Sequence, residues 1–255
     1  MEALRVENLS KSFGGVQALL DVSFTLNAGV KLAIIGPNGA GKTTLLNVLH
    51  GQLFPTTGRI LLFGKDITSL QTHNRVRLGM ARSFQLTNLF PYLTVLENIL
   101  LALGGTETGR IRIYRPITDY KYLYDKAEKF LTAVDLWEKR NDLAQNIGYG
   151  EQRKLEILFC LVSEPRLLLL DEPTCGLTSA ESADLINKIY GLGRDVPAII
   201  VSHDMDLVFG VADRIIVLHQ GSIIADGLPK EIAADPTVRE IYVGIEEDNG
   251  IVAAS

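Results

Sequence analysis

Apolar and polar residues alternate in two stretches near the start of the chain. Residues 4–9 and 22–26 place an apolar side chain at roughly every second position, and Gly14 and Gly15 lie between the two stretches. A period of two is typical of a strand with one buried face. The pattern predicts an N-terminal antiparallel hairpin or small sheet.

Further along, apolar runs become short and continuous. Runs of about four to eight apolar residues are typical of strands buried on both faces. We expect strands at residues 30–35, 59–64, 166–172, 198–203, 214–218 and 221–225. Apolar residues at helical spacing fall between several of them, at residues 45–51, 151–163 and 179–192. Strands that alternate with helices predict an α/β fold with parallel strands.

The stretch from about residue 86 to residue 146 has a different, helical pattern. Residues 94–97 form a capping box before an apolar helix, and residues 120–137 place apolar and aromatic residues at steps of three and four. We expect a helical subdomain inserted into the α/β fold. The segment 104–116 between these helices is either a solvated loop or a surface facing anionic lipid or a partner protein. Its basic residues are Arg110, Arg112 and Arg115.

The overall composition is that of a globular protein. The chain has 255 residues, 47% of them hydrophobic, and a formal net charge of -5. This acidic balance argues against free binding to nucleic acid, which favours a basic surface. No apolar run approaches the roughly 20 residues of a membrane span, and the first residues do not form a signal peptide. We therefore expect the chain to stay in the cytosol unless it docks onto another component. Cys160 and Cys175 lack metal-ligand spacing and are interpreted as reduced thiols.

A glycine-rich stretch lies between the predicted strand 30–35 and the predicted helix 45–51. It fits the spacing G-x-x-x-x-G-K-[ST], whose backbone N–H groups wrap around the phosphates of a nucleotide. Lys42 would reach the terminal phosphates, and the hydroxyl of Thr43 would bind Mg²⁺. The alternative, a glycine-rich turn that binds nothing, is disfavoured by the strand before it and the helix after it. The residues predicted to bind a nucleoside triphosphate are Gly36, Pro37, Asn38, Gly39, Ala40, Gly41, Lys42, Thr43 and Thr44.

Two acids, Asp171 and Glu172, follow a run of four leucines. They stand at the carboxyl end of a predicted buried strand, where ligands bind in open parallel sheets. Asp171 can serve a phosphate-bound Mg²⁺, and Glu172 can accept a proton from an attacking water. Adjacent acids on a turn are ordinarily solvated, but a surface strand would not contain four leucines. His203 ends another predicted strand, and Phe13, beside the Gly-Gly turn, either stacks on an adenine ring or makes a core contact.

In this order, the motifs resemble those of the ATP-binding cassette family, the nucleotide-hydrolysing subunits of ABC transporters. The resemblance covers roughly residues 4–243. It implies a P-loop NTPase fold with a RecA-like core, an N-terminal antiparallel β-subdomain and an inserted helical subdomain. The implied domains are 1–85 with 155–235 for the core, 86–154 for the helical subdomain and 236–255 for the tail. The matched positions are residues 36–44 as Walker A, Gln85 as the Q-loop glutamine, 167–172 as Walker B, Glu172 as the catalytic carboxylate, His203 as the switch histidine and Phe13 as the A-loop aromatic.

The family signature, usually L-S-G-G-Q, departs from its consensus here. It consists of Ile147, Gly148, Tyr149, Gly150 and Glu151. Gly148 removes the hydroxyl that meets the γ-phosphate, but backbone N–H groups at the start of the following helix can still bind an anion. The D-loop at 175–178 lacks its usual final aspartate. The Tyr-Gly pair and the residues after it look like the branched-chain amino acid importer ATPases, a subfamily that also includes ATPases for urea and short-chain amides.

The resemblance implies ATP and Mg²⁺ as cofactors. The residues expected to hold the metal are Thr43, Gln85 and Asp171, and those expected to act on the phosphates are Lys42, Gln85, Glu172 and His203. Two cassettes would face each other head to tail, with Cys175 at their interface and each signature against the ATP of the other chain. The implied partners are a second cassette (the same chain or a related one), two transmembrane permease subunits and a periplasmic or extracellular substrate-binding protein. The implied place is the cytoplasmic face of the inner membrane.

The sequence therefore predicts the ATP-hydrolysing subunit of an importer, for branched-chain amino acids ahead of urea or short amides. Export and lipid transfer are alternatives within the same class. A soluble cassette protein acting on ribosomes or DNA generally carries two cassettes or a long coiled coil, and this chain has one cassette and an acidic balance. A non-hydrolysing regulatory module is opposed by Glu172 and His203.

Overall fold

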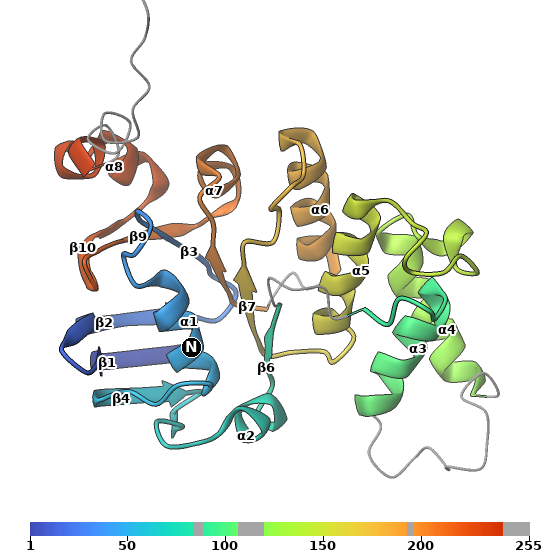
Figure 1. Cartoon of the computed structure of the whole chain (residues 1–255), viewed down its shortest axis with the longest axis horizontal. Helices are drawn as coiled ribbons and strands as arrows, with labels where there is room; N and C mark the ends of the chain where they lie inside the picture. The colour runs from blue at the N-terminus through green and yellow to red at the C-terminus, as the bar shows by residue number, and fades with distance from the viewer. Residues whose placement is uncertain (84–88, 107–119, 193–195, 242–255) are drawn as a thin grey trace, which may run out of the picture. The chain divides into compact units, whose positions relative to one another are not determined.

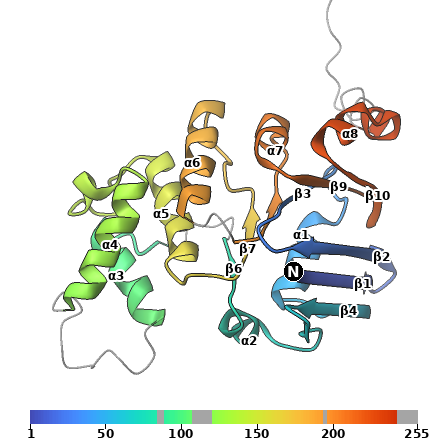
Figure 2. The same cartoon turned by 180° about the vertical axis from the view of Figure 1, so that it is seen from behind.

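The computed structural model describes residues 1–83, 89–106, 120–192 and 196–241. The chain divides into two compact units: unit 1 is residues 1–78 with 197–255, and unit 2 is residues 79–196. Figures 1 and 2 show the elements of each unit from opposite sides. The finer division into core, helical subdomain and tail stays a prediction.

Unit 1 begins with an antiparallel sheet in the order β2-β1-β4-β5. Its strands are β1 (Glu2–Phe13), β2 (Val16–Asn27), β4 (Thr57–Leu62) and β5 (Lys65–Asp66). The alternating residues of β1 and β2 are buried, and the two strands pair through a tight turn from Phe13 to Val16. The predicted N-terminal hairpin is confirmed.

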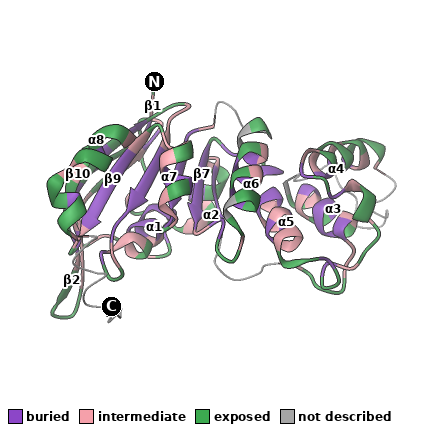
Figure 3. Ribbon diagram, turned by 90° about the horizontal axis from the view of Figure 1, so that it is seen from above, coloured by how far each residue is buried: buried purple, intermediate pink, exposed green. Residues whose placement is uncertain are grey.

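A second group of strands in unit 1 is mostly parallel. Strand β3 (Lys31–Ile35) pairs in parallel with both β8 (Ala198–Val201) and β9 (Arg214–His219), and β10 (Ser222–Gly227) pairs antiparallel with β9. Strand β8 is fully buried, and only the end residues of β9 are not. Figure 3 shows β9 as a buried ribbon. The predicted parallel strands and the closing strand pair are confirmed.

The described residues of unit 1 form four helices: α1 (Lys42–His50), α2 (Thr72–Arg77), α7 (Met205–Val211) and α8 (Pro229–Ala234). Buried side chains of β3 and β9 form one cluster with Val208 of α7 and Ile232 of α8. Helix α1 was predicted by its apolar spacing. The other three were not, because six or seven residues are too few to show helical periodicity.

Unit 2 combines a pair of parallel strands with a group of helices. Strand β7 (Leu167–Asp171) has every residue buried and pairs with β6 (Met80–Arg82). Its helices, as far as the described part of the unit extends, are α3 (Val95–Thr106), α4 (Lys121–Ala133), the 3-10 turn η2 (Trp137–Lys139), α5 (Tyr149–Leu161) and α6 (Ser179–Leu192). Thr94 and Glu97 exchange the hydrogen bonds of a capping box before α3, as predicted.

The predicted helix over 120–137 is shorter in the structure. Helix α4 ends at Ala133, and Asp135 takes a left-handed backbone with φ of 60°. That conformation cannot continue a right-handed helix, so the chain turns and Trp137 begins a separate 3-10 turn. Trp137 nevertheless packs edge-on against Tyr124 of α4, which explains its place in the apolar pattern.

Some predictions fall on residues that are not described. Gln85, Arg110, Arg112, Arg115 and the tail from residue 242 lie outside the described residues. Among the residues that are described, no helix is both long enough and apolar enough to cross a membrane.

Candidate nucleotide-binding site

The predicted phosphate loop connects β3 to α1 in unit 1. Its glycines are required by the close packing of neighbouring backbone. A Cβ on Gly36 would lie 2.1 Å from the carbonyl oxygen of Leu218, and one on Gly41 would lie 2.6 Å from that of Ala18. Gly41 also has a φ of 104° at the N-cap of α1. Glycine meets both demands because it has no Cβ and accepts a positive φ.

This shape presents donors to an anion. The first intrahelical bond of α1 runs from the N–H of Leu45 to the oxygen of Gly41, so the N–H groups of the preceding residues have no partner within the helix. No acidic side chain lies in the first turn. The N–H groups at the start of a helix and the positive end of the helix dipole favour a phosphate here.

The side chain of Lys42 bends back over the loop. Its Nζ donates to the carbonyl oxygens of Gly36 at 2.6 Å and Pro37 at 2.9 Å. The ammonium group is therefore held at the loop. Thr43, the next residue, is exposed in the first turn of α1, where its hydroxyl can reach a cation on the phosphates.

Unit 1 also brings His203 to the same end of the sheet. It follows β8, which pairs in parallel with β3, so both strands have their carboxyl ends at one edge. Ser202 and Asp204 hold the turn around it: the N–H of Asp204 donates to Ser202 Oγ, and Asp204 Oδ1 caps α7 by accepting from the N–H of Leu207. His203 itself is exposed.

Phe13 lies at the end of β1 with 46% of its surface exposed. The Nζ of Lys11 stands 5.0 Å from the centre of its ring. This exposure does not fit the core contact considered from the sequence. Stacking on an adenine ring stays a prediction.

In unit 2, Asp171 ends β7 as a buried carboxylate that is only 2% exposed. Its Oδ2 accepts from Arg82 Nη2 of β6 at 2.8 Å, and its backbone N–H donates to Ser83 Oγ. Its Oδ1 is buried and has no hydrogen-bond partner among the described residues. A hard oxygen without a protein partner suits Mg²⁺, bound directly or through a water.

Glu172 follows with an unusual backbone. Its φ is 47°, in the left-handed region, although it is not a glycine and precedes Pro173. Residues before proline normally take extended conformations. Such a position costs about 1–3 kcal/mol and persists only where the surroundings enforce it. The chain is thus turned sharply where the predicted catalytic carboxylate stands.

The predicted signature forms the start of α5. Ile147 is buried, Gly148 is the N-cap, and Tyr149 begins the helix. Glu151 Oε2 accepts from the N–H of Gly148 at 3.0 Å, and Lys139 lies 2.7 Å from its Oε1. Partial burial opposes ionisation, but these hydrogen bonds and the Lys139 charge outweigh it and lower the pKa of Glu151. Glutamate is therefore accommodated here, as expected at a helix start.

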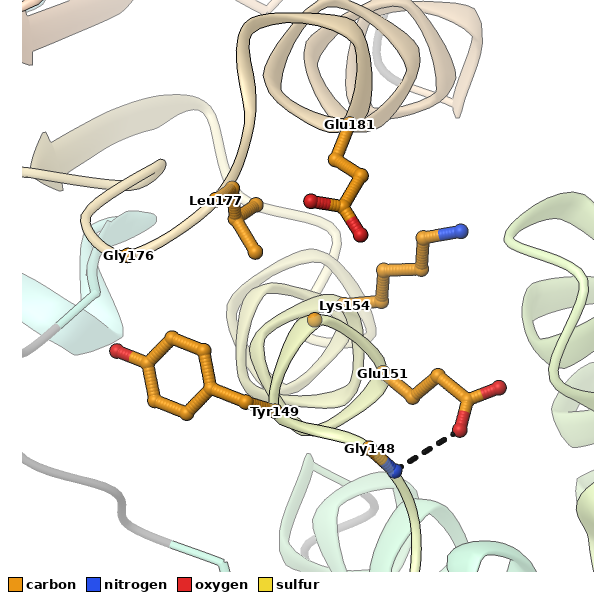
Figure 4. Close-up of a pocket in the computed structure, with 8 residues that line it drawn as sticks. Gly148, Tyr149, Glu151, Lys154, Gly176, Leu177 and Glu181 are labelled. Atoms are coloured by element: carbon orange, nitrogen blue, oxygen red, sulfur yellow. Dashed lines mark hydrogen bonds between the residues drawn. The ribbon is translucent and has the colours of Figure 1, made fainter.

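A hollow of about 490 Å³ opens beside this helix start. Figure 4 shows Tyr149 on one side of α5 and Glu151 and Lys154 on the other, with Leu177 and Glu181 above them. Tyr149 Oη donates to the carbonyl oxygen of Cys175 at 3.2 Å, which joins the signature to the predicted D-loop. The residues that line the hollow are Gly148, Tyr149, Gly150, Glu151, Lys154, Gly176, Leu177 and Glu181.

The sequence analysis predicted most of the residues of this site but did not predict a role for Arg82. An arginine within a short buried strand, with an acid at the end of another buried strand, is the signal that could have found it. The pairing of β6 with β7 could not be read from the chain, because the two strands lie far apart in sequence.

Comparison with known proteins identifies the family. The model of the family described as "ABC transporter" matches residues 19–175. The high-affinity branched-chain amino acid transport ATP-binding protein LivG of Escherichia coli K12 is 38% identical over 248 residues, covering 94% of this chain and 97% of the relative. The protein BraF of Pseudomonas aeruginosa, with the same description, is also 38% identical, over 255 residues.

Solved structures agree with the fold. The ADP conformation of MJ1267, an ATP-binding cassette of an ABC transporter, superposes with a TM-score of 0.83 at 33% identity, covering 96% of this chain and 99% of that one. The predicted cassette fold is confirmed by this likeness. The chain therefore belongs to the ABC transporter family, as an ATP-binding cassette.

Proposed function

We propose that this chain is the ATP-hydrolysing subunit of an ABC importer. The observation that carries the proposal is the Asp171 carboxylate, buried with one oxygen paired to Arg82 and the other without a partner among the described residues. Glu172 follows it directly on a sharply turned backbone. Asp171 can bind a cation, and the neighbouring Glu172 can polarise a water molecule. This pair of carboxylates fits the transfer of a phosphoryl group to water.

In the proposed site, the nucleotide phosphates lie in the loop 36–44 and the adenine stacks on Phe13. Lys42 exchanges the carbonyl oxygens of its loop for phosphate oxygens. Thr43, Asp171 and Gln85 would hold Mg²⁺, which would supply positive charge next to the phosphates.

Two further residues act on the reacting groups in this proposal. Glu172 orients the attacking water and accepts its proton, and His203 contacts the γ-phosphate. Hydrolysis needs mainly positioning and charge neutralisation, because phosphoryl transfer passes through a loose transition state.

The proposed working unit is a pair of cassettes. The signature residues 147–151 of each chain contact the ATP of the other, through the N-terminal N–H groups of α5. The pair sits on two permease subunits at the cytoplasmic face of the inner membrane and receives cargo from a substrate-binding protein.

The proposed cargo is branched-chain amino acids. The support is the function named for LivG and BraF, each covering 94% of this chain. Urea, short amides, export and lipid transfer are the competing cargoes or directions, and the uptake experiment below separates them.

The first test is ATP hydrolysis by the purified chain and its Glu172→Gln variant. Loss of a general base lowers turnover by about 10²–10⁴. We expect that fall with ATP binding retained, because residues 36–44 are unchanged. Glu128→Gln removes an exposed carboxylate of α4 and is the matched control. Near-normal turnover of Glu172→Gln would remove Glu172 from this role.

The same variant tests the cargo. Uptake of labelled leucine, isoleucine and valine, with urea and glutamate as comparisons, is measured in cells carrying either the wild-type chain or Glu172→Gln. We expect branched-chain uptake alone to be lost. Loss of urea uptake instead would change the cargo, and no change in any of them would contradict the importer role.

A further inference from the structure

Helix α5 contacts the turn of the proposed catalytic glutamate as well as carrying the signature. Arg153, one turn after Tyr149, is only 4% exposed. Its guanidinium donates to three successive carbonyl oxygens at the end of β7 and just after it: Nε to Pro173 at 2.9 Å, and Nη2 to Glu172 at 2.5 Å and Asp171 at 3.4 Å. Its Nη1 donates to Glu156 Oε2 at 2.7 Å.

These bonds converge on a strained point of the backbone. The carbonyl oxygen of Glu172 also accepts from the N–H of Cys175 at 3.2 Å, so two donors fix it. Glu172 has a left-handed φ although it precedes a proline, a combination that neighbouring groups must enforce. The hydrogen bonds of Arg153, which come from helix α5, hold the carbonyl groups of this turn.

Tyr149 adds a second contact from the same face of the helix. Residues four apart lie on one side of a helix, so Tyr149 and Arg153 face the same segment. Tyr149 Oη donates to the oxygen of Cys175, and a Cβ on Gly176 would lie 2.7 Å from the Tyr149 ring. Helix α5 thus contacts the segment from Asp171 to Gly176 at both ends of that segment.

We infer that Arg153 is a positioning residue for ATP hydrolysis, which sets the backbone of Glu172 and so aims its carboxylate at the attacking water. The inference rests on the proposed catalytic role of Glu172. It also links two events within one chain, because a displacement of α5 by nucleotide at the signature would be passed to the Glu172 turn through Arg153.

The test is a double-mutant cycle on steady-state ATP hydrolysis by the full chain. Misplacing a catalytic group by about 1 Å can cost on the order of 100-fold in rate. Arg153→Met should therefore lower kcat by about 10- to 100-fold and leave KM for ATP unchanged. Arg153→Lys keeps the positive charge but has one nitrogen in place of the planar guanidinium. Its kcat should lie between the values of the wild type and Arg153→Met. In a Glu172→Gln background Arg153→Met should have no further effect, because the group it aims is gone.

Arg153→Met leaves Glu156 as a buried carboxylate without its cation, which can impair folding. The paired variant Arg153→Met/Glu156→Leu removes both charges and so avoids the lone carboxylate. Its kcat should fall as for Arg153→Met while the chain stays folded, as followed by thermal unfolding. Lys126→Met, at an exposed ion pair of unit 2, is the control and should keep wild-type kcat.

Wild-type kcat in the folded paired variant would overturn the inference. So would an equal fractional loss in the wild-type and Glu172→Gln backgrounds, which would indicate a structural role independent of Glu172. A failure of the proposed function is recognised separately, because Glu172→Gln would then hydrolyse ATP as fast as the wild type.

Discussion

At the scale of the residue, the two cysteines show how surroundings set reactivity. Cys175 is exposed in the predicted D-loop, where its carbonyl oxygen accepts from Tyr149. Cys160 lies in α5, and burial raises the pKa of its thiol to about 12. The thiolate is the reactive form, and a raised pKa keeps Cys160 protonated until the pH approaches that value.

We therefore expect iodoacetamide at mildly alkaline pH to modify Cys175 well before Cys160, as followed by mass spectrometry. Modification should slow ATP hydrolysis, because the proposed partner cassette lies against this loop. A Cys175→Ser variant treated in the same way should keep its untreated rate. Unchanged hydrolysis after complete modification of Cys175 would contradict its place at the interface.

At the scale of the element, helix α1 is held at both ends. The phosphate loop shapes its start, and Gly51 ends it with a left-handed C-cap. Arg75 of α2, which has no exposed surface, lies at this end of α1. Its guanidinium donates to the carbonyl oxygens of Val48, Leu49, Thr68 and Leu70. Burial lowers the pKa of Arg75 to about 10, so it stays charged at neutral pH and complements the negative end of the α1 dipole.

Arg75→Met should destabilise the chain by at least about 3 kcal/mol, since several buried carbonyl groups lose their donor. The measurement is the midpoint of urea unfolding. Arg77→Met, at an exposed arginine of the same helix, should stay within about 0.5 kcal/mol of the wild type. Equal midpoints for the two variants would show that Arg75 does not anchor the end of α1.

At the scale of the whole molecule, the residues that the proposed function uses are divided between the two units. Unit 1 contains the phosphate loop and His203, and unit 2 contains Asp171, Glu172 and the signature. A hollow stands open at the signature, where the proposed partner's nucleotide would bind.

Association should therefore depend on ATP. In size-exclusion chromatography with light scattering, Glu172→Gln should have about twice the 28.0 kDa mass of one chain when ATP is present. With ADP, or with a Lys42→Ala substitution added, it should have the mass of one chain, because the γ-phosphate contacts are missing. A single-chain mass at saturating ATP would argue against the proposed cassette pair.

The sequence by itself determined the features that are encoded locally. The phosphate loop, the buried strand before Asp171, the Thr94 capping box and the long helices all follow from the spacing of neighbouring residues. Such patterns can be read because period and turn chemistry act over a few residues.

Only the tertiary structure decided which distant groups meet. It paired Arg82 with Asp171, placed Arg75 beneath α1 and set Arg153 against the Glu172 turn. An arginine in a sequence carries no sign of its partner, and its ordinary place is the surface. Burial becomes favourable only when the fold supplies a carboxylate or a set of carbonyl oxygens, and those lie on elements brought together by the packing of the chain.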